Sequence, residues 1–312
     1  MILHIRSDYK MFYEGIFYRT LRKTLSAFYH TLKMRSGSYP YVTGDSFRHL
    51  ADHVYDETGI FDPALVKIGD IVFVGNPYMD KFFKEIHPKI NNRYILIQHN
   101  GDLPVDEHVA KYIDDKIIKF YAQCVFIAHE KIIPIPIGIA NKHHGIEISP
   151  ELNVSALVKS SAKKPRIFYH FSIQTNPSER GPALEYFKSH SAMDTIEKFI
   201  PYRSYKKLLS SYCFTASPAG NALGSHRTWE ALYLKTIPIV KRTVDAEYCA
   251  SLGLPLWIVE NWHELGKFSE SELRIKYEEM MSSANFEAIF MDFWINKITA
   301  DQKEARSQYH SI

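Results

Sequence analysis

The sequence predicts an α/β fold of two Rossmann-like domains, each built on a parallel sheet that faces a common cleft. Three observations carry this prediction. Short apolar segments alternate with helical patterns in both halves of the chain. Residues 149–165, rich in Ser, Ala, Lys and Pro, interrupt that alternation and are the linker candidate. The length of 312 residues is about twice that of a typical domain.

The N-terminal half alternates helix and strand. Apolar residues at helical spacing predict a helix over 46–55, with Asp45 as its N-cap. A short apolar run over 70–74 predicts a strand, and the turn Gly-Asn-Pro ends it. The further elements are a helix over 78–85, a buried strand over 94–97, two short strands or a short helix and a strand over 116–121 and 124–128, and an Ile-Pro segment over 132–139.

The C-terminal half restarts the alternation. Its predicted strands cover 166–171, 212–216, 236–240 and 257–259. Its predicted helices cover 180–189, 202–211 and 226–234, and two helical segments close the chain. We therefore divide the chain into an N-terminal domain over 1–155, a C-terminal domain over 156–285 and a C-terminal helix over 286–312. Ligands of parallel sheets bind at the carboxyl ends of the strands, so both sets of strand ends are expected at one cleft.

Composition narrows the function classes. The chain is 46% hydrophobic and 23% charged, which supports a sizeable core and argues against disorder. The net charge is +3, from 38 basic and 35 acidic residues that are mixed along the chain. A nucleic-acid-binding protein usually has a concentrated basic face, so no nucleic-acid partner is expected. The oligomeric state stays open.

The cysteines and the lengths of the apolar runs indicate the cellular compartment. The three cysteines, Cys124, Cys213 and Cys249, lack CxxC spacing, so we expect reduced, buried thiols rather than disulfides or a zinc site. No apolar run reaches the ~20 residues of a spanning helix, and a cytoplasmic location is expected. Residues 12–35 combine aromatic and basic side chains. They fit a core-packed helix with a solvated basic face; the alternative is peripheral contact with the inner face of a membrane.

The segment over 205–241 carries the chemistry. A strand runs into a loop of small residues with Gly220 and Gly224, and a helix begins near Ser225 or His226. Glycines allow close backbone approach, and Ser225 is a suitable cap. The free N–H groups and positive dipole end of such a helix suit a phosphate.

Two charged residues follow on the same helix. Arg227 lies in the first turn, where its guanidinium can bind phosphate oxygens in a fork. Glu230 lies one turn further on, where a carboxylate can accept ribose hydroxyls. Gly and Ser before a helix are also common in ordinary loops, and Glu230 could simply be a solvated surface residue. The spacing alone therefore leaves two interpretations open, a nucleotide site and an ordinary loop.

The string SPAGNALGSHRTWEALYLKTIPIV (217–240) resembles the nucleotide-sugar motif of exostosin-like glycosyltransferases, in their bacterial branch. The strings GDSFRHLADH (44–53), LIQHNGD (96–102), IPIGIAN (135–141) and FSIQTNPSER (171–180) resemble segments of that branch in the same order. The resemblance covers roughly 38–245. It implies a GT-B fold, with the donor held by the C-terminal domain and the acceptor on the N-terminal side. A C-terminal helix that crosses back onto the first domain is also implied.

The resemblance also implies roles for individual residues. Glu230 would bind the ribose. The diphosphate would be surrounded by Arg180, Ser225, His226 and Arg227, and the remaining donor-side candidates are Ser217, Gly220, Asn221 and Lys241. The acceptor-side candidates are Arg48, Asn100 and Asn141.

Two absences refine the mechanism. No Asp-x-Asp occurs in the chain, and metal-dependent sugar transferases commonly use that pair to hold a divalent cation. We therefore expect no metal and no cofactor, with cationic side chains and a helix dipole in their place. Many retaining GT-B enzymes carry two glutamates with seven residues between them. If Glu230 is the second, the first position is Ala222, so inversion is favoured.

Inversion requires a general base from the N-terminal side of the cleft. Asp102, in the loop after the strand over 94–97, is the first candidate. His99 is the second and Asp45 the third. Each has a structural alternative: a turn residue, a strand-end histidine and an N-cap. The pair His143-His144 does not suggest a shared metal ion, because adjacent residues of a strand point to opposite faces; Trp229 fits core packing.

The sequence thus predicts a metal-independent, inverting glycosyltransferase that moves a sugar from a nucleotide diphosphate, preferably a UDP-sugar, to a glycan or glycolipid acceptor. By resemblance, the setting is bacterial lipopolysaccharide or surface polysaccharide synthesis. Two alternatives stay open: a fucosyltransferase-like GT-B enzyme that uses a GDP-sugar, and a non-catalytic module of the same fold that binds a glycan or nucleotide.

Overall fold

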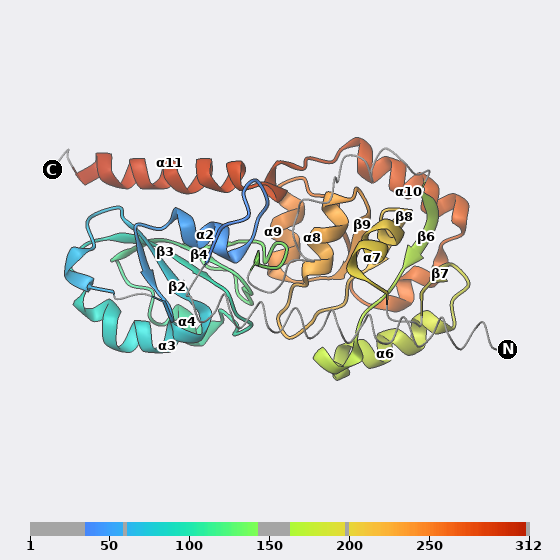
Figure 1. Ribbon diagram of the computed structural model, residues 1–312, viewed down its shortest axis with the longest axis horizontal. Coiled ribbons are helices and arrows are strands. Elements are labelled where there is room, and N and C mark those ends of the chain that lie inside the picture. The colour runs from blue at the N-terminus through green and yellow to red at the C-terminus, as the bar shows by residue number, and fades with distance from the viewer. Residues whose placement is uncertain (1–34, 59–60, 143–162, 197–199, 310–312) are drawn as a thin grey trace.

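A computed structural model describes residues 35–58, 61–142, 163–196 and 200–309. Two five-stranded sheets, each entirely parallel, lie side by side with helices around them (Figure 1). This is the two-sheet α/β arrangement that the sequence predicts. The predicted boundary near 155 and the histidine pair His143-His144 lie outside the described residues, as does most of the linker candidate.

The first sheet contains five strands in sequence order: β1 (His53–Tyr55), β2 (Ile71–Gly75), β3 (Tyr94–His99), β4 (Ile117–Ala122) and β5 (Ile132–Pro134). All residues of β2 and β3 are buried, because both faces of this sheet are covered. Around it lie α2 (Gly44–Leu50), α3 (Met79–Lys81), α4 (Glu107–Ala110), the 3₁₀ helices η1 (Pro63–Leu65), η2 (Asn76–Tyr78) and η4 (His87–Lys89), and the π-helical segment η3 (Phe82–Ile86).

Two local predictions in this half are wrong. The helix expected over 46–55 is only α2, which Thr43 rather than Asp45 caps, and its last predicted residues form β1. Parallel pairing of β1 with β2 outweighs the local helical spacing. The strand expected over 124–128 is absent, because Cys124 has φ 62° and turns the chain; one isolated bridge joins Val125 to Val105.

The second sheet has the strand order β10-β9-β8-β6-β7. Its strands are β6 (Lys164–Phe168), β7 (Met193–Asp194), β8 (Tyr212–Ala216), β9 (Ile237–Lys241) and β10 (Trp257–Val259). Strand β6 begins two residues before the predicted strand, inside the linker candidate, and ends earlier. The chain first moves outward from β6 to β7 and then crosses to β8 on the other side. The junction of β6 and β8 is therefore a topological switch point, where such sheets bind ligands.

Helices surround the second sheet and close the chain. They are α6 (Pro177–Lys188), α7 (Tyr202–Leu209), α8 (His226–Tyr233), α9 (Val244–Ser251), α10 (Glu270–Ser282) and α11 (Met291–Tyr309), with short turns η7 (Ile173–Thr175), η8 (Trp262–Lys267) and η9 (Glu287–Ile289). Helix α9 was not predicted, although Thr243 caps it and two acidic residues occupy its first turn.

Helix α11 runs along the first domain (Figure 1). Its Trp294 is fully buried, with its ring 6.0 Å from that of Phe47, and Arg306 donates to Asp70 at 2.9 Å. The apolar cluster around Trp294 is continuous between the domains, since it includes Phe73 of β2 and Leu232 of α8. The two domains therefore share one core along this side of the cleft.

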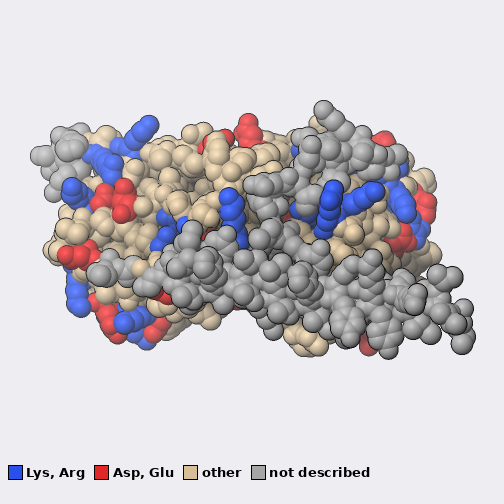
Figure 2. Space-filling model, viewed as in Figure 1, with Lys and Arg blue, Asp and Glu red and all other residues tan. Residues whose placement is uncertain are grey.

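Surface features agree with the mixed charge of the sequence. Basic and acidic side chains are interspersed on the face shown in Figure 2, without a large area of one sign among the coloured residues. Cys124, Cys213 and Cys249 are free and buried, as predicted. Within the described ranges, no helix combines the length and the apolar character needed to cross a membrane.

Candidate functional site

Two adjoining cavities lie between the domains, at the carboxyl ends of the strands. The first, of about 340 Å³, is polar and is lined by Arg35, Gly44, His99, Asn100, Gly101, Asp102, Gln123, Ile137, Ile139, Asn141 and His226. The second, of about 240 Å³, is largely apolar and lies mainly against the second domain. Gln123 and Ile137 line both cavities, so the two are neighbours. We call the first the polar cavity and the second the apolar cavity.

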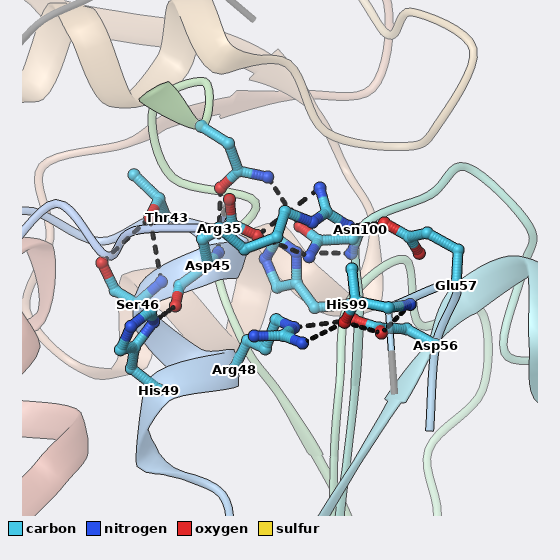
Figure 3. A network of polar contacts seen from close by, with 12 residues as sticks. Arg35, Thr43, Asp45, Ser46, Arg48, His49, Asp56, Glu57, His99 and Asn100 are labelled. Carbon is cyan, nitrogen blue, oxygen red and sulfur yellow. Dashed lines mark hydrogen bonds and ion pairs between the residues drawn. The ribbon is translucent and has the colours of Figure 1, made fainter. Parts of the chain in front are cut away.

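A ring of hydrogen bonds forms the first-domain wall of the polar cavity (Figure 3). The Asn100 side-chain N–H donates to Asp45 Oδ1 at 3.1 Å, and Asn141 donates to Asn100 Oδ1 at 2.8 Å. The Asp45 backbone N–H closes the ring by donating to Asn141 Oδ1 at 2.8 Å. The acceptor-side candidates Asn100 and Asn141 are thus brought together at the cavity.

Asn100 adopts a left-handed backbone conformation, with φ 65°. Asparagine tolerates this region better than most residues, and the ring of hydrogen bonds holds it there. Gly44 makes this possible, because a Cβ at Gly44 would lie 1.9 Å from Asn100 Oδ1. The loop after β3 is therefore fixed just before Asp102.

His99 does not fit the role of general base, contrary to the sequence analysis. Its Nδ1 accepts from the Asn100 backbone N–H at 2.7 Å, so its Nε2 carries the proton that is donated to Pro136 O at 3.0 Å. Burial lowers the pKa of His99 to about 4. Both ring nitrogens are occupied and the ring is neutral, so His99 is a positioning residue.

Asp45 and Arg48 also differ from their predicted roles. The Asp45 carboxylate is 1% exposed, lies 3.7 Å from Arg35 and accepts from Asn100, so it is not open to a substrate hydroxyl. Arg48 forms an ion pair with the buried carboxylate of Asp56 at 2.7 Å, which argues against direct acceptor contact. Figure 3 shows these side chains around the N-terminal end of α2.

Asp102 remains the accessible carboxylate on this wall. It lines the polar cavity and is exposed, and its side chain accepts no hydrogen bond from any residue that the structure describes. A carboxylate with free oxygens is what a general base requires. Asp102 is therefore the one of the three predicted bases whose geometry suits the task.

The second-domain wall is built at the β6–β8 switch point. The hydroxyls of Ser217, after β8, and Thr228, in α8, lie 2.8 Å apart and tie the loop to the helix. Ser225 caps α8 by accepting from the Arg227 N–H, as the sequence predicts. His226, the first residue of α8, donates from Nδ1 to Gly138 O of the first domain at 2.7 Å, because a carbonyl oxygen only accepts. The N-terminal turn of α8 thus borders the polar cavity.

Arg180 is not available to a diphosphate, contrary to the expectation from the resemblance. It is 5% exposed, and its guanidinium donates to Ala219 O at 2.8 Å and Pro218 O at 3.2 Å. Further bonds go to Ser172 O and to the Thr175 hydroxyl. Because so many carbonyls share it, Arg180 holds the loop after β8 in place. Gly220 allows this approach, since a Cβ there would lie 3.2 Å from the guanidinium.

The remaining donor-side candidates lie around α8. Arg227 lies 6.0 Å from the centre of the Phe171 ring, at the carboxyl end of β6. Glu230 accepts from the Tyr202 hydroxyl at 2.8 Å. Lys241 forms an ion pair with Glu179 at 2.7 Å and lines the apolar cavity, and Asn221 is exposed on the loop. Trp229 is buried in the core, as expected.

Gln123 and Asp245 are site residues that the sequence did not indicate. Gln123 follows β4 and lines both cavities, and Asp245 of α9 lines the apolar cavity. The Val125 backbone N–H donates to Asp245 Oδ1 at 3.1 Å, which links the domains. Burial raises the pKa of Asp245 to about 7. The capping pattern at Thr243 would have located the start of α9, but not the partner across the interface.

A metal site was not expected from the sequence. Among the residues that the structure describes, no three His, Cys, Asp or Glu side chains form a group that could hold a metal ion. Independence from metal stays a prediction that requires a binding experiment.

Comparisons with known proteins give similarity to solved structures only. No family model and no curated protein matches the chain. An α,α-trehalose 6-phosphate synthase from Burkholderia multivorans matches with a TM-score of 0.46 and 10% identity, over 80% of this chain and 73% of that one. A UDP-forming α,α-trehalose-phosphate synthase from Burkholderia xenovorans matches with a TM-score of 0.44 and 10% identity, over 76% and 74%. The resemblance to exostosin-like enzymes therefore rests on the sequence strings alone.

Proposed function

We propose that the protein is an inverting glycosyltransferase that takes a sugar from a nucleotide diphosphate donor, preferably a UDP-sugar, and transfers it to a carbohydrate acceptor. One observation carries this proposal: Asp102 of the first domain and His226, at the start of α8 in the second, line the same polar cavity. A proton acceptor and a phosphate-binding helix end thus face one space of about 340 Å³.

The reaction follows from this placement. An oxygen of Asp102 takes the proton of the acceptor hydroxyl, and the hydroxyl oxygen forms a bond to the anomeric carbon. The bond from that carbon to the diphosphate oxygen breaks, and the diphosphate leaves with the electron pair. Arg227 and the free N–H groups of α8 stabilise the departing charge. Because these groups supply positive charge, we propose that no metal and no cofactor is needed.

The setting is proposed from the resemblance. It favours a glycan or glycolipid acceptor in bacterial lipopolysaccharide or surface polysaccharide synthesis, and a cytoplasmic location at or near the inner face of the membrane. The segment over 12–35, which suggested peripheral membrane contact, lies outside the described residues except for Arg35.

The first experiment measures nucleotide binding. Thermal shifts with UDP, GDP, CMP and dTDP are recorded with Mg²⁺ and with EDTA. A ligand at 100 times its Kd adds about 2.7 kcal/mol to the free energy of unfolding, a shift of several degrees. Stabilisation by UDP that persists in EDTA is expected. Preference for GDP would support the fucosyltransferase-like alternative, and no stabilisation by any nucleotide would refute the donor site.

The second experiment tests catalysis. Release of nucleoside diphosphate from the sugar donor is measured with water or a glycan as acceptor. Asp102→Asn should lower kcat by about 10²- to 10⁴-fold, because the general base is lost, while nucleotide affinity is unchanged. Asp115→Asn, which changes an exposed carboxylate of the same domain, is the control. An active Asp102→Asn would refute the assignment of the base, and nucleotide binding without turnover would favour the non-catalytic module.

A further inference from the structure

Three side chains of α7 gather on the face that meets Glu230 of α8. The Tyr202 hydroxyl donates to Glu230 Oε1 at 2.8 Å. The ring of Tyr205 stacks on that of Tyr202, with centroids 6.0 Å apart and planes 25° apart. The Lys206 ammonium lies 4.4 Å from the centre of the Tyr202 ring. These residues lie three and four positions apart, the spacing that places side chains on one side of a helix.

Burial fixes the positions of two of these side chains. Tyr205 is 7% exposed and Lys206 is 8% exposed, so neither side chain is free to swing into solvent. A buried ammonium requires compensation, and Glu230 supplies the nearby negative charge. The Tyr202 ring is therefore packed against both Tyr205 and Lys206, while its hydroxyl holds Glu230. Side-chain freedom at Glu230 is lost before any ligand arrives.

One oxygen of Glu230 is held by the fold. Oε1 accepts from the Tyr202 hydroxyl, and the Tyr205 hydroxyl lies near the same carboxylate. Glu230 is partly exposed, so a ligand can reach it. It lies four residues, or about 6 Å, along α8 from His226, where the diphosphate is proposed to bind. A distance of this size separates the diphosphate of a nucleotide from its ribose. A diphosphate at His226 would therefore place its ribose near Glu230.

We infer that the donor is a ribonucleoside rather than a deoxyribonucleoside diphosphate sugar, and that Tyr202 is the positioning residue that aims Glu230 at the ribose hydroxyl. This inference rests on the proposed function. It adds a discrimination that Tyr202 controls although it does not touch the nucleotide. A hydroxyl that donates to a charged acceptor contributes about 1.5–3 kcal/mol, which corresponds to roughly a 10- to 100-fold difference in Kd.

The test is isothermal titration with UDP and 2′-deoxy-UDP, with GDP and 2′-deoxy-GDP in parallel. The wild-type protein should bind the ribonucleotide 10- to 100-fold more tightly. In Tyr202→Phe this ratio should fall below about threefold, while the affinity for the deoxynucleotide stays unchanged. A role in folding alone would weaken both ligands equally. Tyr277→Phe, which removes a 2.8 Å bond from a hydroxyl to Lys235 O in the same domain, should keep the ratio.

The other outcomes count either against this inference alone or against the proposed function as well. A wild-type protein that binds ribo- and deoxyribonucleotides equally, or a Tyr202→Phe protein that keeps the full ratio, would overturn this inference and leave the donor site intact. Binding of neither nucleotide would refute the proposed function and the inference with it. If Tyr202→Phe fails to fold, Glu230→Gln gives the second measurement. It keeps an oxygen for the Tyr202 bond but loses the charge, so an undiminished ratio would again overturn the inference.

Discussion

The substitution Gly44→Ala tests whether the ring of hydrogen bonds positions the catalytic loop. A Cβ at this position would lie 1.9 Å from Asn100 Oδ1 and 2.3 Å from His99 Nδ1, whereas contacts below 3.0 Å are essentially never found. His99 is buried and bonded at both ring nitrogens, so Asn100 or the start of α2 has to move. The displacement needed is on the order of 1 Å.

The expected cost follows from the bonds that this movement breaks. Asn100 would lose its bond to the Asp45 carboxylate, worth about 1.5–3 kcal/mol, and its bond from Asn141, worth about 1 kcal/mol. The lower entropy of the unfolded alanine chain offsets about 0.4–1 kcal/mol. The free energy of unfolding should therefore fall by about 1.5–3.5 kcal/mol.

The effect on turnover should be larger than the effect on binding. Asp102 follows Asn100 by two residues, and a displacement of about 1 Å can lower the rate roughly 10²-fold. The proposed nucleotide-binding groups lie in the second domain, so nucleotide affinity should be unchanged. Urea denaturation, isothermal titration and donor turnover measure the three quantities.

Gly181→Ala is the matched control. No atom lies within 4 Å of a Cβ at Gly181, which is inside α6. The same chemical change should there stabilise the protein by up to about 1 kcal/mol, with unchanged turnover. If Gly44→Ala had wild-type stability and turnover, the close packing of α2 against the loop after β3 would be wrong, and so would the positioning role of the ring.

Two further substitutions test the electrostatics. The folded pKa of Asp245 is raised by burial to about 7, above its ordinary value of 3.8, so ionisation should lower the free energy of unfolding as the pH rises from about 4 to 7. Asp245→Asn should therefore be more stable than wild type at pH 8, by on the order of 2–4 kcal/mol, and similar at pH 4; equal urea midpoints at pH 8 would contradict this. Lys163→Met should lower the free energy of unfolding by about 3 kcal/mol or more in urea denaturation, because four buried oxygens lose their ammonium donor. The control Lys188→Met changes an exposed lysine and should alter stability by less than about 0.5 kcal/mol. Equal losses in the two variants would refute the reasoning. The four oxygens belong to Ser210, Tyr212, Leu234 and Thr236.

Local signals predicted most elements, because those signals lie within a few residues. Strand β8 has the predicted ends, and α8 begins at His226 after the predicted cap Ser225. The helix expected over 46–55 shows the limit of this reasoning. Its last residues join β1, and the pairing that decides this comes from β2, 19 residues further along the chain. Apolar residues in so short a segment fit either structure until a neighbouring strand is known.

The candidate site divides in the same way. Residue types and their order located the loop after β3 and the start of α8, and the structure places both at one cavity. Whether the polar atoms of each candidate are free to bind a ligand could not be predicted from residue types and their order. Four candidates, His99, Asp45, Arg48 and Arg180, have their polar atoms occupied by partners in the folded chain.

The sequence by itself determined the two-domain α/β plan, the capped helix α8 and the set of residues able to perform the chemistry. Only the tertiary structure decided which of them face the cavity with free oxygens or nitrogens. Asp45 meets Asn141 across 96 positions of sequence, and Tyr202 meets Glu230 across 28. Helix caps and turns depend on neighbours along the chain, whereas hydrogen-bond occupancy and burial depend on neighbours in space.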